Sequence, residues 1–241
     1  MRDYSKEKEK RVDFIRKVIS DAGARGIVYG NSGGKDASLV GILCKLACDN
    51  TVGLILPCGS NQNYGSDMSD ANTVAKQFGI ETRTVDLKVT AAAVQFALCD
   101  ATELTDAAAA NIAPRLRMTA LYAVAASEGR LVSGTGNASE RHMGYFTKWG
   151  DGAFDFNPIA DLTVTEIYEF LEYLGAPKSI LTKAPSAGLF DGQTDEGEMG
   201  VTYRSIDEFL LTGKATEAEL EIITKHHKAS MHKVNPPIAY K

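Results

Sequence analysis

Short runs typical of strands alternate along the chain with longer segments typical of helices. The run at 52–56 is apolar throughout, as expected for a strand that is covered on both faces. The predicted strands are 26–29, 52–56, 82–87 and 131–134. Apolar residues recur at helical spacing in the other segments, and the predicted helices are 6–21, a helix that includes 39–43, 67–78, 90–99, about 107–128, and two that begin at the capping boxes Thr163–Glu166 and Thr216–Glu219.

Strands that alternate with helices predict an α/β fold with a doubly wound, mostly parallel sheet and helices on both faces. The chain has no internal repeat and no low-complexity linker, so we expect a single domain over residues 1–241. Ligands of such sheets bind at the carboxyl ends of the strands. The loops 30–37, 57–65 and 134–137 each follow a predicted strand and are therefore expected to line one rim. Residues 183–200 are rich in Gly, Pro and Asp and have no periodicity, which predicts a structureless lid.

Composition narrows the class of protein. The chain has 241 residues, a formal net charge of −5 and no block of basic residues, so we expect no nucleic-acid partner. No apolar run approaches the length of a membrane span, and the charged start has no signal-peptide core, which favours a cytoplasmic protein without a membrane partner. Cys44 and Cys48 lie four residues apart in an apolar helical segment, where two buried thiols are expected rather than a metal site.

A Gly-rich loop between the first strand and the next helix carries the first chemical signal. Backbone N–H groups and a helix N-terminus at such a turn are suited to bind phosphate. The spacing is not that of a Walker A loop, because three residues rather than four separate the outer glycines and Asp follows the Lys. The loop resembles the SGGxDS motif of the N-type ATP pyrophosphatases, with Ala in place of the last Ser. Its residues are Gly30, Asn31, Ser32, Gly33, Gly34, Lys35, Asp36 and Ala37.

Longer motifs in the second half of the chain are similar to those of the NAD synthetases. Residues 134–159 resemble the stretch GTGNxSExxxGYFTKxGDGxxDxxPI, residues 111–118 resemble the helix motif NIxxRxRM, and residues 183–196 resemble the loop KxPSAxLxxGQxDE. Together with a late His-Lys pair, the resemblance covers about residues 25–237. It implies an adenine nucleotide α-hydrolase-like fold. The short chain, without an appended glutamine-hydrolysing domain, favours the ammonia-dependent form.

The resemblance implies an ATP-dependent amidation. The carboxylate of deamido-NAD attacks the α-phosphorus of ATP, which gives an adenylate and pyrophosphate, and ammonia then displaces AMP. The chain's task is mainly positioning and charge stabilisation. Relatives are homodimers, and the apolar helix predicted at about 107–128 could lie in such an interface or be buried within one chain.

Site residues follow from the same resemblance. Asp36 and Glu140 are expected to hold Mg²⁺ beside the phosphates, although each alone could be an ordinary acid in the first turn of a helix. Lys35 could contact phosphate or be a solvated lysine, and Lys183 is expected to be a catalytic cation of the lid. Two further ATP-binding residues are implied, Thr135 and Ser186. The implied deamido-NAD-binding residues are Arg115, Lys148, Asp155, His232 and Lys233, whereas Arg117 is expected to point elsewhere.

Three residues depart from the family's pattern. Ala37 replaces a Ser in the loop, Val164 stands where relatives often have Lys, and Val234 replaces an Arg after the His-Lys pair. Two alternatives stand beside the amidation, and only the second rests on these departures. One is another ATP pyrophosphatase, for which a basic surface or a CxxC pair would be expected, and the other is a non-catalytic adenine-nucleotide sensor.

Overall fold

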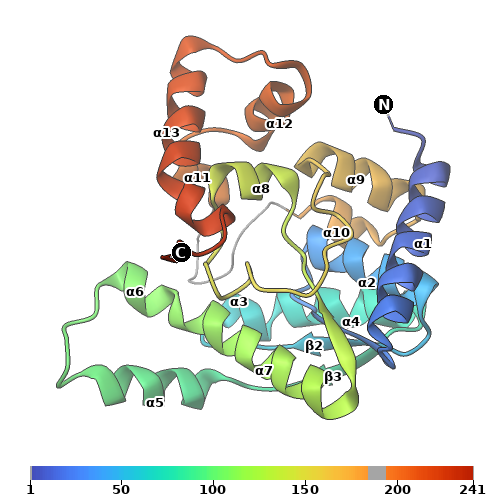
Figure 1. Ribbon diagram of the computed structural model, residues 1–241, viewed down its shortest axis with the longest axis horizontal. Helices are drawn as coiled ribbons and strands as arrows, with labels where there is room; N and C mark the ends of the chain where they lie inside the picture. The colour runs from blue at the N-terminus through green and yellow to red at the C-terminus, as the bar shows by residue number, and fades with distance from the viewer. Residues whose placement is uncertain (1, 184–193, 241) are drawn as a thin grey trace.

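A parallel sheet of four strands forms the centre of the molecule (Figure 1). The computed structural model describes residues 2–183 and 194–240. The strands are β1 Gly26–Gly30, β2 Thr51–Ile55, β3 Glu81–Thr84 and β4 Arg130–Ser133, in the order β3-β2-β1-β4. From β1 the chain passes first to β2 and β3 on one side and later to β4 on the other side. The direction of the strand order therefore reverses at β1, beside its carboxyl end. This is the point at which ligands of doubly wound sheets bind.

Helices cover both faces of the sheet, as predicted. On one face, Ile27 and Tyr29 of β1 pack in a cluster with α1 Tyr4–Ala22, α2 Lys35–Ala47, α4 Ser66–Phe78, α9 Val164–Tyr173 and α10 Lys178–Leu181. On the other face, Val28 packs with residues of β2 and of α7 Ile112–Glu128. Alternate residues of β1 thus enter opposite cores, as the period of two along a strand requires. Helix α5 Lys88–Leu98 and helix α6 Asp106–Ala110 extend away from the sheet beside α7 (Figure 1).

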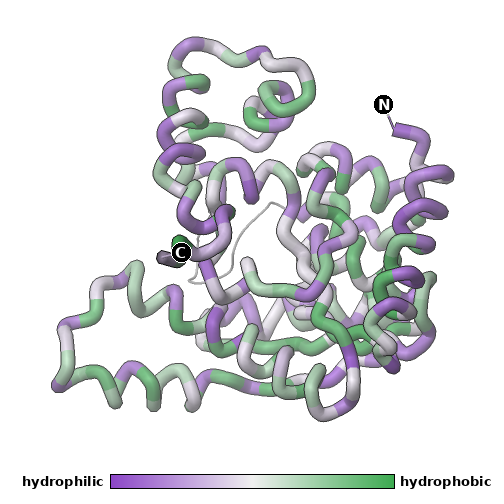
Figure 2. The backbone as a smooth tube through the Cα atoms, in the orientation of Figure 1, coloured by the Kyte–Doolittle hydropathy of each residue, from purple (hydrophilic) through white to green (hydrophobic). Residues whose placement is uncertain are grey.

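A third apolar cluster joins the C-terminal helices to the rest of the molecule. It contains Met143 of α8 Ala138–Met143, Met199 of α11 Asp195–Met199, Ile206 of α12 Tyr203–Thr212 and Ile223 of α13 Glu217–Val234. Figure 2 shows hydrophobic and hydrophilic residues interspersed along α12 and α13. These helices therefore stand over the carboxyl end of the sheet on a core of their own.

The predicted elements are mostly confirmed. All four strands form, and both predicted capping boxes begin helices, α9 at Thr163 and α13 at Thr216. The strand predicted at 82–87 ends at Thr84. The structure also contains the short helix α3 Asn61–Tyr64, together with α8, α10 and α12, none of which was predicted. No helix among the described residues is long and apolar enough to span a membrane.

Two predictions about helices are wrong. The helix predicted at about 107–128 is broken into α6 and α7 at Asn111, because Pro114 cannot continue a helix whose carbonyl at Ala110 would meet its ring. The segment 183–200 was predicted to be structureless, but residues 195–199 form α11, and its buried Met199 belongs to the third cluster. Residues 184–193 of that segment lie outside the described residues.

Candidate active site

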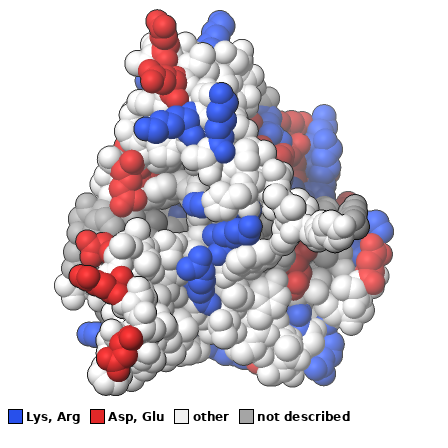
Figure 3. Space-filling view, turned by 60° about the vertical axis from the view of Figure 1, so that its left-hand side comes forward, with Lys and Arg blue, Asp and Glu red and all other residues white. Residues whose placement is uncertain are grey.

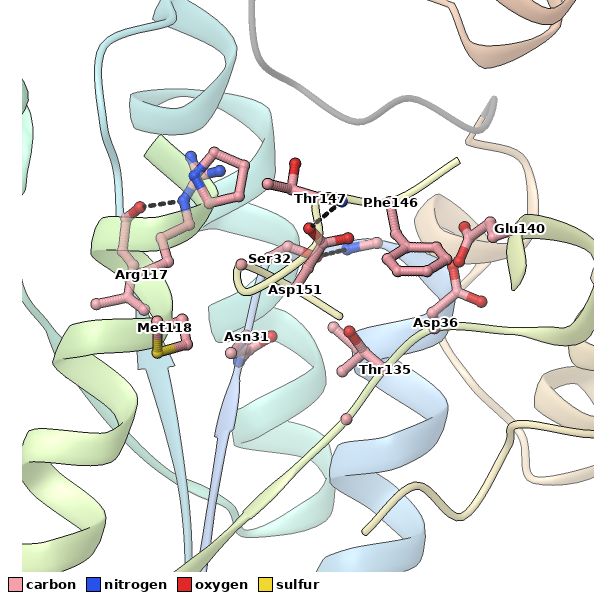
Figure 4. A pocket seen from close by; sticks show the side chains of 18 of the residues that line it. Asn31, Ser32, Asp36, Arg117, Met118, Thr135, Glu140, Phe146, Thr147 and Asp151 are labelled. Carbon is pink, nitrogen blue, oxygen red and sulfur yellow. Dashed lines mark hydrogen bonds between the residues drawn. The ribbon is translucent and has the colours of Figure 1, made fainter. Parts of the chain in front are cut away.

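A pocket of about 420 Å³ opens at the carboxyl ends of β1, β2 and β4 (Figure 4). The three loops expected to line one rim all contribute to it, through residues such as Ser32, Asn63 and Thr135. Helix α7, the loop that follows α8, and Lys183 also line it, together with residues of α4, α8, α9, α11 and α13. Figure 3 shows Lys and Arg side chains gathered in the middle of one face of the molecule, with Asp and Glu toward its edges. Such a distribution attracts an anionic ligand.

The loop between β1 and α2 has the geometry of a phosphate cradle. Strand β1 ends at Gly30, α2 begins at Lys35, and the Ser32 Oγ accepts a hydrogen bond from the Gly34 N–H (3.3 Å). Gly33 has a φ of +72°, and a Cβ built on it would lie 2.1 Å from the Asp67 carbonyl oxygen. Only glycine fits this position, because the loop is both left-handed and pressed against α4.

Asp36 and Glu140 lie close to each other on one side of the pocket (Figure 4). Asp36 lies in the first turn of α2, and Glu140 lies in the first turn of α8. Asn137 connects them, because its Nδ2 donates to the Asp36 Oδ1 (3.0 Å) and its backbone N–H donates to the Glu140 Oε2 (3.2 Å). Glu140 is thus the N3 acid of a capping box, and its side chain is only 18% exposed. The alternative of a solvated first-turn acid is wrong for Glu140.

Lys35 supplies a cation to both carboxylates. Its Nζ lies 2.8 Å from the Asp36 Oδ2 and 3.9 Å from the Glu140 Oε1. The side chain is buried, so the alternative of a solvated lysine is wrong. Burial and the charge of Asp36 raise the pKa of Glu140 well above its ordinary value, against the opposing effect of Lys35. Burial would lower the pKa of Lys35, but the charges of Asp36 and Glu140 raise it. The two carboxylates therefore share Lys35 as their common counter-cation.

Lys183 lies next to the loop between β1 and α2. Its Nζ donates to the Asp67 Oδ1 and the Asp70 Oδ2 (2.8 Å each), both on α4, and is 3.5 Å from the Gly33 carbonyl oxygen. Asp67 also accepts hydrogen bonds from the side chains of two residues of the loop after β2, Gln62 and Asn63. Lys183 thus stands at the pocket with its charge paired. Ser186 lies outside the described residues.

The residues implied to bind deamido-NAD divide into two groups. Lys233 lines the pocket, and its Nζ donates to the carbonyl oxygens of Gly144 (2.8 Å) and Phe146 (3.0 Å). The other four lie outside the pocket lining: Arg115, Lys148, Asp155 and His232.

The hydrogen bonds of these four residues join them to other parts of the chain. Lys148 donates to the carbonyl oxygen of His232 (2.6 Å), which fixes the end of α13 against the loop after α8. Arg115 is exposed and donates to the carbonyl oxygen of Lys148 (3.3 Å). Asp155 accepts from the backbone N–H of Val132 (2.7 Å) and from the Tyr122 hydroxyl (3.2 Å).

Arg117 and Asp151 are two of the lining residues that were not anticipated as part of the site. Arg117 lines the pocket, and it donates to the Leu56 carbonyl oxygen (3.0 Å) and the Asn63 Oδ1 (3.1 Å). Burial lowers its pKa, and it forms no ion pair with a carboxylate in the described part of the chain. Asp151 also lines the pocket and accepts from the backbone N–H of Thr147 (2.9 Å). Asp151 belongs to the Gly-Asp-Gly segment of the longest motif, a signal that could have identified it.

Comparison with known proteins places this site in a family. A sequence model described as NAD synthase matches residues 7–237. The chain belongs to the NAD synthase family. It is 44% identical over 238 residues to the NH(3)-dependent NAD(+) synthetase of Carboxydothermus hydrogenoformans, with 98% of this chain and 97% of the relative covered.

Solved structures of the NAD synthase family have the same fold. A structure described as NMN synthetase from Francisella tularensis has a TM-score of 0.94 at 38% identity and covers 100% of this chain and 99% of that one. The NH3-dependent NAD synthetase from Campylobacter jejuni, in complex with the nitrate ion, has a TM-score of 0.82 at 29% identity and covers 100% of each chain.

Two of the departures from the NAD synthase pattern are packing residues. Ala37 is 2% exposed within α2 and belongs to the first core cluster. Val164 is 4% exposed at the start of α9 and belongs to the third cluster. Its side chain therefore contributes to the core and supplies no charge. Val234 ends α13 directly after Lys233, and nothing in the structure explains its presence in place of Arg.

Proposed function

We propose that this protein amidates the carboxylate of deamido-NAD with ammonia, at the expense of ATP, and releases AMP and pyrophosphate. One observation carries the proposal: a glycine-rich loop at a helix N-terminus and two carboxylates around one cation line a single pocket of a NAD synthase-family chain. The loop suits a bound pyrophosphate, which leaves the α-phosphorus as the electrophile. Attack by a carboxylate then forms an acyl adenylate, and ammonia displaces AMP from it.

ATP is assigned to the loop Gly30–Ala37, with Thr135 after the neighbouring strand β4. Backbone N–H groups at the start of α2 stabilise the phosphates, and the helix dipole adds to this effect. Lys183 is assigned to the leaving pyrophosphate, because its ammonium is already close to Gly33 of the same loop. Ser186 keeps its assignment to ATP from the family motif alone.

Mg²⁺ is the metal that the site suits. Asp36 and Glu140 come from two separate helices and share one counter-cation, and carboxylates with phosphate oxygens are the usual ligands of Mg²⁺. The metal would be held by these two residues and would supply charge neutralisation for the pyrophosphate. The position of the Lys35 ammonium beside both carboxylates supports this assignment, because a cation fits there.

The acid substrate is assigned to the wall formed by Lys233, Asp151 and Arg117. Arg117 has no carboxylate partner in the described part of the chain and therefore suits an anion. The other part of a dinucleotide would then extend toward Arg115, Lys148 and the neighbouring Asp155 and His232 outside the pocket. A homodimer would cover such an exposed part, and we propose this assembly too.

Ammonia is proposed as the nitrogen donor, and the environments of Cys44 and Cys58 agree with this because neither suits glutamine hydrolysis. Burial raises the pKa of Cys44 to about 12, and Cys58 donates to the carbonyl oxygen of Leu87 (3.8 Å). A nucleophilic cysteine needs the opposite environment, one that lowers its pKa.

A second candidate substrate is the mononucleotide, nicotinate mononucleotide. The observation that favours it is the TM-score of 0.94 with the structure described as NMN synthetase, against 0.82 with the C. jejuni NAD synthetase. Only the pocket would then be needed, since a mononucleotide lacks the part that would extend over the surface.

The experiment measures AMP and pyrophosphate with ATP, Mg²⁺ and an ammonium salt, in the presence of deamido-NAD, of the mononucleotide, or of neither acid. We expect AMP formation that requires an acid, and the acid with the higher kcat/KM is the substrate. With ¹⁸O in the carboxylate, one label should enter the AMP phosphate. AMP formation that is independent of both acids, label in orthophosphate, or a strict need for glutamine would contradict the proposal.

A further inference from the structure

Lys35 occupies the place between the two carboxylates to which Mg²⁺ was assigned. Its Nζ is 2.8 Å from Asp36 and 3.9 Å from Glu140, and it lies 5.5 Å from the centroid of the Tyr203 ring. The Lys35 side chain is only 6% exposed. In the described part of the chain, no other Lys or Arg forms an ion pair with either carboxylate.

An ammonium and a divalent cation cannot both be bound there at contact distance. Two positive charges a few ångströms apart repel each other, and the repulsion is strong where water is largely excluded. A metal ligated by Asp36 and Glu140 must therefore displace the Lys35 Nζ and its charge-assisted hydrogen bond to Asp36.

The displaced side chain has another partner within reach when ATP is bound. Lys35 is the first residue of α2 and directly follows Gly34 of the phosphate-binding loop. A lysine has a flexible four-carbon stem and a compact charge, so its ammonium can turn from the carboxylates to a phosphate oxygen. Metal binding without nucleotide offers it no such partner.

We propose that Lys35 is a built-in counter-cation that fills the metal position before the metal and ATP bind, and that it weakens metal binding until ATP is present. The inference rests on the proposed Mg²⁺ site. The residue thereby favours arrival of the metal together with the nucleotide, and it acts on metal affinity rather than on the reacting atoms.

The test is a titration of the full-length protein with Mn²⁺, which takes the same oxygen ligands as Mg²⁺ and is followed by its electron paramagnetic resonance, without nucleotide. Lys35→Met should bind Mn²⁺ about tenfold more tightly than wild type, because the metal no longer displaces a charge-assisted hydrogen bond. Lys45→Met, on the same helix but paired with the exposed Asp49, is the matched control and should bind as wild type.

Asp36→Asn and Glu140→Gln distinguish a failure of the proposed metal site from a failure of the role proposed for Lys35. Loss of Mn²⁺ binding in both variants supports the metal site, and wild-type affinity in both would overturn that site and the inference with it. If both lose binding while Lys35→Met binds no more tightly than wild type, the inference alone is overturned.

A crystal structure of the wild-type protein with Mn²⁺ tests the displacement of Lys35 without any variant, so the result does not depend on whether a variant folds. The Lys35 Nζ should then have left Asp36. A metal between Asp36 and Glu140 with the Nζ still within hydrogen-bond distance of Asp36 would overturn the inference.

Discussion

Single charged side chains determine what this pocket can bind. Two carboxylates that lie close together repel each other, and a cation between them offsets this repulsion; the chain supplies Lys35 in that place. The same pairing recurs at Lys183, which lies between Asp67 and Asp70. Each cation can be exchanged for another positive charge, or a new anion can approach it, without a change of fold.

The residue-scale prediction concerns the two carboxylates. Asp36→Asn and Glu140→Gln should each lower kcat/KM at least about a hundredfold, because charge stabilisation of the pyrophosphate is lost. The melting temperature should stay within a few degrees, since each variant also relieves a repulsion between like charges. Glu219→Gln is the matched control, because Glu219 holds the same position in a capping box outside the pocket. Normal turnover in either pocket variant, at limiting Mg²⁺, would show that the assignment is wrong.

Sequence motifs located the chemistry better than they located individual side chains. The strand pattern predicted the three loops at one rim and the motifs named both carboxylates and Lys183, and all of them contribute to the pocket. They did not predict that Arg117 would line the pocket while Arg115 lies outside it. Residues two apart on a helix point in different directions, and the nearly uniform apolar pattern of α7 does not reveal which direction faces the pocket.

At the scale of elements, close contact between the loop Gly30–Ala37 and α4 is the feature on which the site depends. Gly33→Ala should lower turnover about a hundredfold, because its Cβ would meet the Asp67 carbonyl oxygen at 2.1 Å and a small displacement of reacting groups is costly. Gly175→Ala has the same φ of +72° but no atom within 4 Å, so it should lose only about 1–2 kcal/mol of stability and keep its activity. Equal activity of the two variants would contradict this account.

A second element-scale prediction concerns the attachment of α1 by Asp161. Arg11 donates to both oxygens of Asp161 (2.7 and 3.0 Å), and Arg2 adds a third hydrogen bond (2.8 Å). Partial burial raises the pKa of Asp161, but these arginines bring it down to about 2. A lowered carboxylate pKa stabilises the fold above the ordinary value of 3.8, and this stability is lost as the pH falls toward 2.

Asp161→Asn should therefore cost about 1 kcal/mol at pH 7, after allowance for the exposure of Asp161. The difference from wild type should shrink as the pH falls from about 4 to about 2. Urea denaturation at a series of pH values measures both effects. Asp13→Asn, which removes only an exposed pair with Arg16, is the control and should leave stability unchanged. A difference that persists at pH 2 would not come from the charge of Asp161.

The predictability of elements followed the strength of their local signals. The capping boxes at Thr163 and Thr216 were found because a first-turn pattern is read directly from the sequence. The short helices α3, α10 and α11 have four or five residues, too few for a period to be visible. The buried Met199 of α11 packs with distant residues, and such tertiary contacts have no local sequence signal.

At the scale of the whole molecule, the exposed apolar surface is the feature that bears on assembly. Helix α7, which was expected to present a smooth apolar face, packs Leu116, Leu121 and Val124 partly against the sheet within one chain. The apolar residues left exposed nearby are on α5, where Val89 is 81% and Phe96 is 79% exposed. This helix extends from the body beside α6 (Figure 1). A projecting apolar helix is typical of a surface that a second copy covers.

We therefore expect a dimeric mass in light scattering at micromolar concentration, with α5 in the interface. Phe96→Glu should shift the mass toward the monomer, because a buried unpaired charge is unfavourable. Leu211→Glu, an equally drastic change at an exposed apolar residue of α12, should leave the mass unchanged.

If a partner covers the part of deamido-NAD that extends beyond the pocket, Phe96→Glu should also raise KM for deamido-NAD about tenfold. KM for ATP should change less, because the ATP loop belongs to one chain. A monomeric wild-type protein would contradict the assembly. A monomeric variant with both KM values unchanged would place the whole substrate within one chain and would favour the mononucleotide.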